Sequence, residues 1–191
     1  MNWLAHLVLS EPSPAFRIGN LLPDILSALE MGALGGEFRR GIDCHRAIDR
    51  FTDAHPVVRR SIRRIEPPFR RYGGILIDVF YDHYLACGWS DYCEIPLPEF
   101  VGAVQASFEA QRGALPLLAY ARLQQIKAGG WLASYQELGG VRRALEGIGA
   151  RLRRPCELGR ATAQLEIHYE ALRQDFREFF PELRAYVATL S

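Results

Sequence analysis

The sequence predicts an all-α protein that forms a single domain. Most of its 191 residues fall into segments whose apolar side chains recur every three or four positions, as along one face of a helix. Glycine and proline separate these segments, and no stretch alternates between apolar and polar residues as a half-buried strand does. With 49% hydrophobic residues, a chain of this length supports one sizeable core and is short for two domains.

The N-terminal part is predicted to hold two helical segments and a loop. Residues 2–9 form a short apolar segment. Ser13-Pro14 combines an N-cap residue with a proline at the first helical position, which predicts a helix through about Leu29 with a kink or break at Pro23. The loop that follows is marked by three glycines, Gly32, Gly35 and Gly36.

Three further helices are predicted before residue 90. Residues 42–54 and 57–66 have helical patterns that end at Pro56 and at Pro67-Pro68. The stretch GGILIDVFYDHYLACGW (73–89) is apolar on nearly every side, which is typical of a buried helix. The second half of the chain predicts four more helices, over 98–112, 117–127, 131–147 and, ahead of Pro181, 158–178.

Charge is balanced over the whole chain but uneven along it. The chain has 23 basic and 22 acidic residues, so its net charge of +1 creates no global field that favours nucleic acid. Six arginines lie within RRSIRRIEPPFRR (59–71), opposed only by Glu66. The few aromatic residues in or next to this run, Phe69 and Tyr72, match no nucleic-acid-binding motif, so we expect no nucleic-acid partner.

The cysteines and the start of the chain indicate a cytoplasmic protein. Four cysteines (44, 87, 93 and 156) have unrelated spacings without a CxxC pattern, which favours reduced thiols over a disulfide framework or a thiolate zinc site. The first residues lack the basic segment of a signal peptide, and no apolar run approaches the roughly 20 residues of a membrane-spanning helix. We therefore expect no membrane partner.

Two carboxylates stand out within the most apolar helix. Asp78 and Asp82 are four residues apart and so share one helix face, while the adjacent His83 lies about 100° around the helix. Buried carboxylates are costly unless they are protonated, paired or bound to a metal. The two readings left open are buried ion pairs with Arg46 or Arg50 and a metal site.

A second group of ionisable residues lies in GIDCHRAIDRFTDAHP (41–56). His45, Asp49 and Asp53 follow one another at intervals of four, which places an imidazole and two carboxylates along one stripe. Mixed His and Asp ligands suit Mn²⁺, Mg²⁺, Fe or Zn²⁺. Arg46 beside them offers a planar guanidinium to a carboxylate or a phosphate. Each residue also has a structural reading, as a solvated helix face or, for Asp53, as a turn cap.

Other conspicuous polar residues have structural explanations of comparable weight. His6 and His168 lie in apolar surroundings where a histidine is often a satisfied core residue, and Asp43 and His55 are structural candidates. Asp24 follows the apolar stretch GNLLP. Serine, threonine or cysteine nucleophiles lack a supporting pattern, because the sequence has no GxSxG motif, and its glycine pairs match neither a P-loop nor a dinucleotide fingerprint.

Taken together, these motifs resemble one family over essentially the whole chain, the acyl carrier protein phosphodiesterases, which look like divergent members of the HD superfamily of metal-dependent phosphohydrolases. The resemblance rests on five stretches in matching order: MNWLAHLVLS (1–10), GNLLPD (19–24), GIDCHRAIDRFTDAHP (41–56), GGILIDVFYDHYLACGW (73–89) and LEIHYEAL (165–172). One departure concerns the namesake His-Asp dipeptide, because this chain has Asp82-His83 in reversed order.

The resemblance implies an HD-phosphohydrolase-like helical bundle that removes the 4′-phosphopantetheine arm from holo acyl carrier protein. Mn²⁺ is the implied cofactor, with Mg²⁺ or Fe as alternatives. The implied metal ligands are His6, Asp24, His45, Asp78, Asp82 and His83, and Asp53 also matches the family pattern. Arg46 would hold a phosphate oxygen, and Asp49 would orient a ligand histidine or accept the proton of the attacking water.

The same resemblance implies a partner for the arginine run. Acyl carrier proteins are small and strongly acidic, so a basic surface can attract and dock them. The residues expected to dock the carrier protein are Arg59, Arg60, Arg63, Arg64, Arg70 and Arg71. A plain solvated face is the alternative. Two other functions remain open, an HD-type hydrolase of small phosphoesters or nucleotides and a non-catalytic module that binds an acidic protein. The oligomeric state is open.

Overall fold

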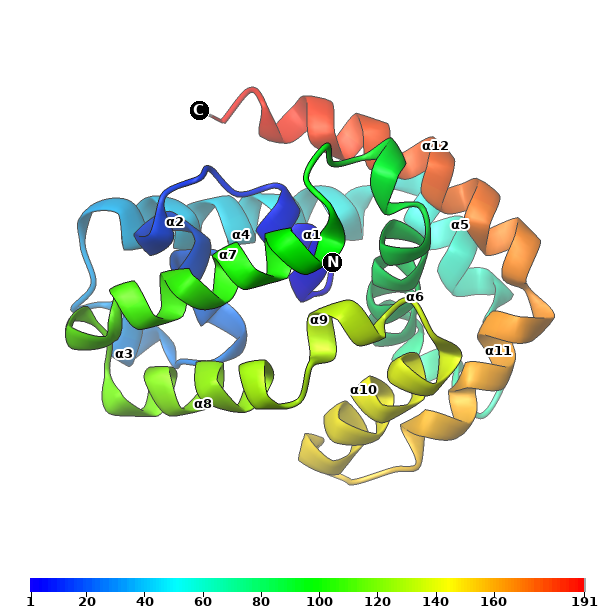
Figure 1. Ribbon diagram of the computed structural model, residues 1–191. Helices are drawn as coiled ribbons and strands as arrows, with labels where there is room; N and C mark the ends of the chain where they lie inside the picture. The colour runs from blue at the N-terminus through cyan, green and yellow to red at the C-terminus, as the bar shows by residue number, and fades with distance from the viewer. Residues whose placement is uncertain (191) are drawn as a thin grey trace.

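The computed structural model describes residues 1–190, and within them it confirms the predicted all-α fold (Figure 1). These residues form α-helices, short 3₁₀ helices and no strand. The α-helices are α1 (Trp3–Val8), α2 (Pro14–Gly19), α3 (Ala28–Met31), α4 (Gly36–Ala54), α5 (Pro56–Arg64), α6 (Gly73–Cys87), α7 (Leu97–Ala110), α8 (Leu117–Ala128), α9 (Trp131–Ser134), α10 (Leu138–Arg151), α11 (Thr162–Ile167) and α12 (Tyr169–Val187). The 3₁₀ helices are η1 (Leu22–Asp24), η2 (Arg70–Tyr72), η3 (Trp89–Asp91), η4 (Arg112–Ala114) and η5 (Leu158–Ala161).

Two predicted helix boundaries in the first half differ from the structure. The break predicted at Pro23 is confirmed, since the segment is divided into α2, η1 and α3 and a proline has no N–H for a helical hydrogen bond, but the last of these helices ends at Met31 and not at Leu29. The helix expected over 42–54 starts six residues earlier, at Gly36, whose φ of +55° suits a residue without a Cβ. The extra turns bring Phe38 into the core.

The second half differs in a similar way. The helix predicted over 131–147 is divided into α9 and α10, and the C-terminal helix is divided at His168 into α11 and α12. The prediction that α12 ends before Pro181 is wrong, because α12 continues to Val187 with the proline inside it. Phe179, Phe180 and Leu183 are all buried, so packing on both sides of the proline outweighs the lost hydrogen bond.

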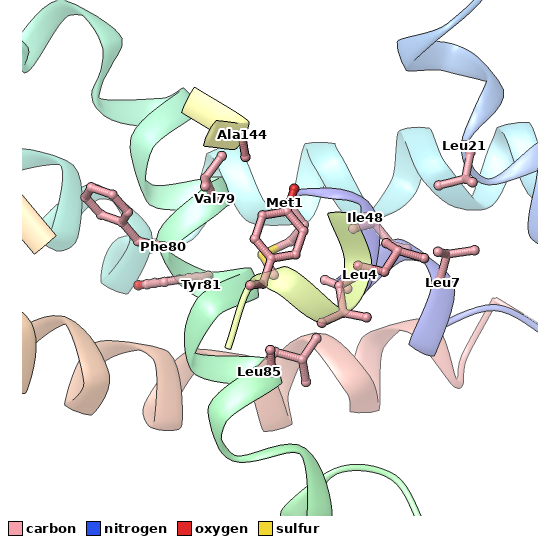
Figure 2. Packing of buried hydrophobic residues seen from close by; sticks show 14 of the residues in the cluster. Met1, Leu4, Leu7, Leu21, Ile48, Val79, Phe80, Tyr81, Leu85 and Ala144 are labelled. Atoms are coloured by element: carbon pink, nitrogen blue, oxygen red, sulfur yellow. The ribbon is translucent and has the colours of Figure 1, made fainter. Parts of the chain in front are cut away.

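Helix α6 lies at the centre of the core and packs against α1, α5, α10 and α12. Eleven of its fifteen residues are buried, as the apolar pattern of 73–89 predicts. Leu4 and Leu7 of α1 belong to the same buried cluster as Ile48 of α4 and Leu85 of α6 (Figure 2). The apolar side chains thus join the N-terminal helix to the two helices that carry the conspicuous Asp and His residues. Across residues 1–190, the helices fall short of the length and apolarity required to cross a bilayer.

Glycines allow α2 and α4 to approach closely. A Cβ on Gly19 would lie 2.3 Å from the carbonyl oxygen of Phe38, and one on Gly41 would lie 2.2 Å from that of Phe16. These distances are far inside van der Waals contact, so larger residues would push the helices apart. The contact matters for the site because Asn20, at the end of α2, is thereby held next to His45 on α4.

Candidate metal centre

Two histidines and one aspartate meet where α1 crosses α4. The imidazole rings of His6 and His45 are stacked with their centroids 4.0 Å apart. Asp49 faces both, with Oδ2 3.0 Å from His45 Nε2 and Oδ1 3.3 Å from His6 Nε2. One ligand atom from each of the three residues lies within 4.8 Å of the other two, so the group can hold a metal ion. Both histidines are buried, while the Asp49 side chain is 40% exposed.

Asn20 orients both imidazoles. Its backbone carbonyl accepts a hydrogen bond from His45 Nδ1 at 2.8 Å, and its side-chain Oδ1 lies 3.1 Å from His6 Nδ1. The orientation of its amide follows from Nδ2, which donates to the carbonyl oxygen of His6 and to Ser10 Oγ. With both Nδ1 atoms donating to oxygens, both Nε2 atoms face Asp49, and that of His6 also lies 3.2 Å from the carbonyl oxygen of Met1. In a neutral ring the Nε2 atom offers a lone pair, and in a charged ring it carries a proton that it donates to an oxygen.

This donor set fits a divalent metal ion. Two Nε2 lone pairs that face one carboxylate repel it unless a cation or an additional proton lies between them. Protonating both stacked rings is unfavourable, because the two positive charges would lie about as close as the rings themselves. Histidines that offer one nitrogen to a metal and donate with the other to an oxygen are the usual arrangement in metal sites. Two imidazoles and a carboxylate suit Mn²⁺, Fe or Zn²⁺.

The electrostatics of the three residues agree with a need for positive charge. Burial lowers the pKa of His6. Burial also opposes the charged form of His45, but its bond to Asp49 and the nearby carboxylates raise its pKa overall. Burial would raise the pKa of Asp49, yet the hydrogen bonds that His45 and His6 donate when their rings are protonated, together with the Met1 amino group, hold it far below its ordinary value. Asp49 is therefore a carboxylate at every physiological pH.

Two more predicted ligands border the cluster. Asp24 Oδ1 lies 3.8 Å from His45 Nε2, and its Oδ2 accepts a hydrogen bond from Trp3 Nε1 at 2.8 Å. The amino group of Met1 lies 3.1 Å from Asp78 Oδ1 and 3.4 Å from Asp49 Oδ1, so a positive charge already sits between two of the acidic side chains. Burial raises the pKa of Asp78, while the amino group opposes that shift.

Asp82 and His83 lie apart from this cluster and have other partners. The two oxygens of Asp82 accept hydrogen bonds from the backbone N–H groups of Leu4 and Ala5, at 2.8 and 3.1 Å. Burial raises the pKa of Asp82 to about 7, although those two bonds favour the charged form. His83 Nδ1 donates to the carbonyl oxygen of Tyr135, and its Nε2 faces the hydroxyl of Tyr169, so both ring nitrogens have partners outside the centre.

The predicted phosphate-binding arginine is placed on the surface. Arg46 lies 3.4 Å from Asp43 in an exposed ion pair and lines none of the cavities beside the centre. The other residues singled out in that motif are also outside the centre: His55 accepts a hydrogen bond from the N–H of Val57 at the start of α5, and Asp53 is exposed.

The arginine run divides into paired and open members. Arg60 and Arg64 form ion pairs with the buried Asp175 of α12, and Arg60 also pairs with Glu178. The remaining four are exposed: Arg59, Arg63, Arg70 and Arg71. Two of these four make local contacts, since Arg59 Nε donates to the carbonyl oxygen of Asp53 and Arg70 Nε to that of Ile65.

A cleft opens beside the centre. One cavity of about 230 Å³ lies between α1, α6, α9 and α10 and is lined by Asp24 and Asp78. A second cavity of about 100 Å³ continues toward α8 and shares four of its lining residues with the first, namely Trp3, Asp24, Trp131 and Arg151. The two predicted ligands therefore form the floor of a cleft that a substrate can enter.

Sequence reasoning missed two residues of this site. Asn20 lies inside the motif GNLLPD (19–24). Its membership of that motif is the signal in the sequence that could have marked it. Arg151 ends α10 within RLRRP and is one of many arginines, so the sequence carries no signal for it. Only the packing of α10 against α6 brings it to the cleft.

The fold and the site define an all-α protein with a His–His–Asp centre able to hold a metal ion, whose two histidines are buried and which lies next to an open cleft. The sequence profile described as "Acyl carrier protein phosphodiesterase" matches residues 1–183. The chain belongs to the acyl carrier protein phosphodiesterase family, whose name denotes phosphodiester hydrolases.

Individual relatives cover nearly the whole chain. The acyl carrier protein phosphodiesterase of Enterobacter sp. (strain 638) is 32% identical over 184 residues, which span 96% of this chain and 95% of the relative. That of Yersinia enterocolitica is 32% identical over 188 residues, with the same coverage of both chains. That of Pectobacterium atrosepticum is 29% identical over 194 residues and covers 99% of this chain and 98% of its own. No solved structure matches the chain.

Proposed function

We propose that this protein removes the 4′-phosphopantetheine arm from holo acyl carrier protein in a reaction that depends on a divalent metal ion, with Mn²⁺ as the native ion. The observation that carries the proposal is the cluster of His6, His45 and Asp49, with both imidazoles oriented by Asn20, in a chain of this family. His and Asp ligands offered from helices also support a relationship to the HD phosphohydrolases.

His6, His45 and Asp49 would hold the ion, and Asp24 would complete the ligand set from the cleft side. When bound, the ion would act as a Lewis acid on the phosphoryl oxygens and would lower the pKa of a water molecule. Asn20 keeps the two Nδ1 atoms protonated, so that both Nε2 atoms stay available as ligands.

Hydrolysis breaks the bond between phosphorus and the serine oxygen of the carrier protein. A water oxygen attacks the phosphorus, and a carboxylate must take up the proton that the water releases. Asp78 is well suited to this role, because it lines the cleft and because burial raises its pKa, which makes it the stronger base. The proton then passes to the serine oxygen, and the products are apo carrier protein and 4′-phosphopantetheine.

The open arginines offer a surface for the acidic carrier protein. Arg63 and Arg71 are exposed at the surface of α5 and η2, whereas Arg60 and Arg64 are engaged by Asp175. If the exposed arginines dock the carrier protein, raising the salt concentration will increase KM strongly and leave kcat little changed. A KM that is insensitive to salt would contradict docking by charge. The four free cysteines support a reducing location, which we infer to be the cytoplasm.

Mass spectrometry of the carrier protein tests the activity directly. Purified protein incubated with holo carrier protein and Mn²⁺ is expected to remove the mass of the arm and to leave apo carrier protein. The variants His45→Ala and Asp49→Ala are expected to lose this activity, while Asp43→Ala, on the same helix but outside the centre, retains it. Hydrolysis of nucleotides or small phosphodiesters with the holo carrier protein left intact would favour the alternative activity.

A further inference from the structure

The cleft beside the centre has two chemically different parts. Its inner part, between α6 and α10, has an apolar wall formed by Ile75, Val79, Ala144 and Ile148. Val79 and Ala144 lie next to each other in Figure 2, which shows where the two helices meet along this wall. The acidic floor lies where the cleft meets the metal centre, at Asp24 and Asp78.

Aromatic side chains close one side of the cleft. Trp3 and Trp131 are stacked with their ring centroids 5.7 Å apart, and both line the two cavities. Deeper inside, the hydroxyl of Tyr135 accepts a hydrogen bond from the side chain of Asn2 at 2.6 Å. An apolar wall with a few fixed polar groups is typical of small-molecule sites, and the two cavities together slightly exceed the lower limit of about 300 Å³ for such sites.

Of the described residues, Arg151 is the one guanidinium that lines both cavities, whereas Arg122 lines only the second and the amino group of Met1 is paired with Asp78. Arg151 lies at the junction that also contains Asp24, and it forms no ion pair with any residue in the described part of the chain. Ala144, Ile148 and Arg151 are spaced i, i+4 and i+7, so one face of α10 supplies both the apolar wall and this guanidinium. A guanidinium in such a place suits an anion with two oxygens, such as a phosphoryl group.

We propose that the inner cleft binds the pantetheine arm of the substrate and that Arg151 binds a phosphoryl oxygen of the phosphodiester at its mouth. The choice of ligand rests on the activity proposed above. The arm is an uncharged chain with two amides and a gem-dimethyl group, which matches an apolar wall that carries few polar groups. The phosphodiester is the charged end of the substrate, and Arg151 and Asp24, which line both cavities, are the charged groups where the two cavities join.

Two small molecules test the arm site and the role of Arg151 separately. The reaction product 4′-phosphopantetheine carries both the arm and the phosphate, whereas pantetheine carries the arm alone. Binding of each to the protein in Mn²⁺ buffer is measured by calorimetry and by quenching of the fluorescence of Trp3 and Trp131. The third tryptophan, Trp89, is buried elsewhere and donates its Nε1 to the carbonyl oxygen of Ile95.

The Ala144→Phe variant fills the inner cleft and is expected to weaken both ligands at least tenfold. The Arg151→Gln variant removes the charge from an exposed position and is expected to weaken 4′-phosphopantetheine about tenfold, the usual size for a hydrogen bond to a charged group, while pantetheine binds as before. Arg142→Gln, on the same helix but outside both cavities, is the matched control and is expected to change neither affinity. Circular dichroism establishes that Ala144→Phe is folded.

The outcomes separate this proposal from the proposed activity. Release of the arm by the wild-type protein, with unchanged ligand affinities in folded Ala144→Phe and in Arg151→Gln, overturns the arm site and leaves the activity standing. Binding that follows the expected pattern without release of the arm from the holo carrier protein overturns the activity and leaves the site standing. Equal losses for pantetheine and 4′-phosphopantetheine in Arg151→Gln contradict the role given to the guanidinium.

Discussion

Asn20 is the residue on which the orientation of the centre depends. Its backbone carbonyl and its side-chain oxygen hold the Nδ1 atoms of two different histidines, and its amide N–H group is held in turn by the His6 carbonyl and Ser10. One side chain therefore fixes the tautomer of His6, while the backbone of the same residue fixes that of His45. Few substitutions preserve both the shape and the donor and acceptor of the amide.

The Asn20→Ala variant is expected to weaken Mn²⁺ binding by about 10- to 100-fold, because His6 loses the partner that orients it. Isothermal titration calorimetry measures the affinity. Ser10→Ala is the matched control, since it removes a partner of the Asn20 amide and leaves both imidazole contacts in place. Unchanged Mn²⁺ affinity in Asn20→Ala would contradict the orienting role.

Asp82 is expected to make the free energy of unfolding of the metal-free protein fall as the pH rises. Its pKa is raised by burial to about 7 in the folded state, against 3.8 as the ordinary value, so between these pH values the folded state binds more protons than the unfolded state. The free energy of unfolding contributed by Asp82 therefore falls as the pH rises from 4 to 7 and is constant above. At about 1.4 kcal/mol per pH unit the full fall is about 4 kcal/mol.

The Asp82→Asn variant cannot ionise and isolates this contribution. We expect the free energy of unfolding of the wild-type protein minus that of Asp82→Asn to decrease between pH 4 and pH 7, as measured by urea denaturation with a chelator present. Subtraction removes the contribution of Asp49, whose lowered pKa acts in the opposite direction and at lower pH. A difference that stays constant, or rises, over this range would show that Asp82 is not held in its uncharged form.

At the scale of single elements, the contact between α2 and α4 leaves no room for a side chain. A Cβ at Gly41 would lie 2.2 Å from the Phe16 carbonyl oxygen, a backbone atom that cannot turn aside. The Gly41→Ala variant is expected to be destabilised by roughly 1–3 kcal/mol or more, as overpacked core positions are. The shift of α2 would also move Asn20 and so weaken metal binding.

Gly102 provides the comparison for this prediction. It lies on α7, and a Cβ there meets no atom within 4 Å, so Gly102→Ala is expected to stabilise the protein by roughly 0.5–1 kcal/mol through helix propensity alone. Urea denaturation of both variants gives the comparison. Equal effects of the two substitutions would rule out the close packing of α2 against α4.

Element by element, the sequence predicts helix type better than helix ends. The apolar run of α6 and the proline at the start of α5 mark real helices, because each signal acts locally. The continuation of α12 through Pro181 depends on burial of Phe180 and Leu183 against other helices, which no local pattern contains. The same limit applies to the site: the spacing of His45 and Asp49 is local, whereas their meeting with His6 depends on how α1 packs.

At the scale of the whole molecule, the proposed metal ligands join separate parts of the chain. His6 comes from α1, Asp24 from η1, and His45 and Asp49 from α4. Because these ligands come together only in the folded state, an ion that binds them stabilises that state, by about 2.7 kcal/mol when its concentration is a hundred times Kd. Mn²⁺ is therefore expected to raise Tm, and a chelator is expected to reverse the rise.

Thermal denaturation of the His45→Ala variant controls for Mn²⁺ bound elsewhere. This variant is expected to show no Mn²⁺-dependent rise in Tm, whereas Asp43→Ala responds like the wild-type protein. The same rise in His45→Ala would place the stabilising ion outside the proposed centre.

The anchoring of α1 by Asp82 has a consequence for the exchange of backbone hydrogens. A helix of six residues is too short to be stable alone, and its N-cap residue makes no side-chain cap bond, so the Leu4 and Ala5 N–H groups depend on a carboxylate of α6. Local opening of this helix would release His6 and disassemble the centre in the same event. An ion held by His6 therefore slows that opening, and hydrogen exchange at Leu4 and Ala5 becomes a direct report of whether the centre is occupied.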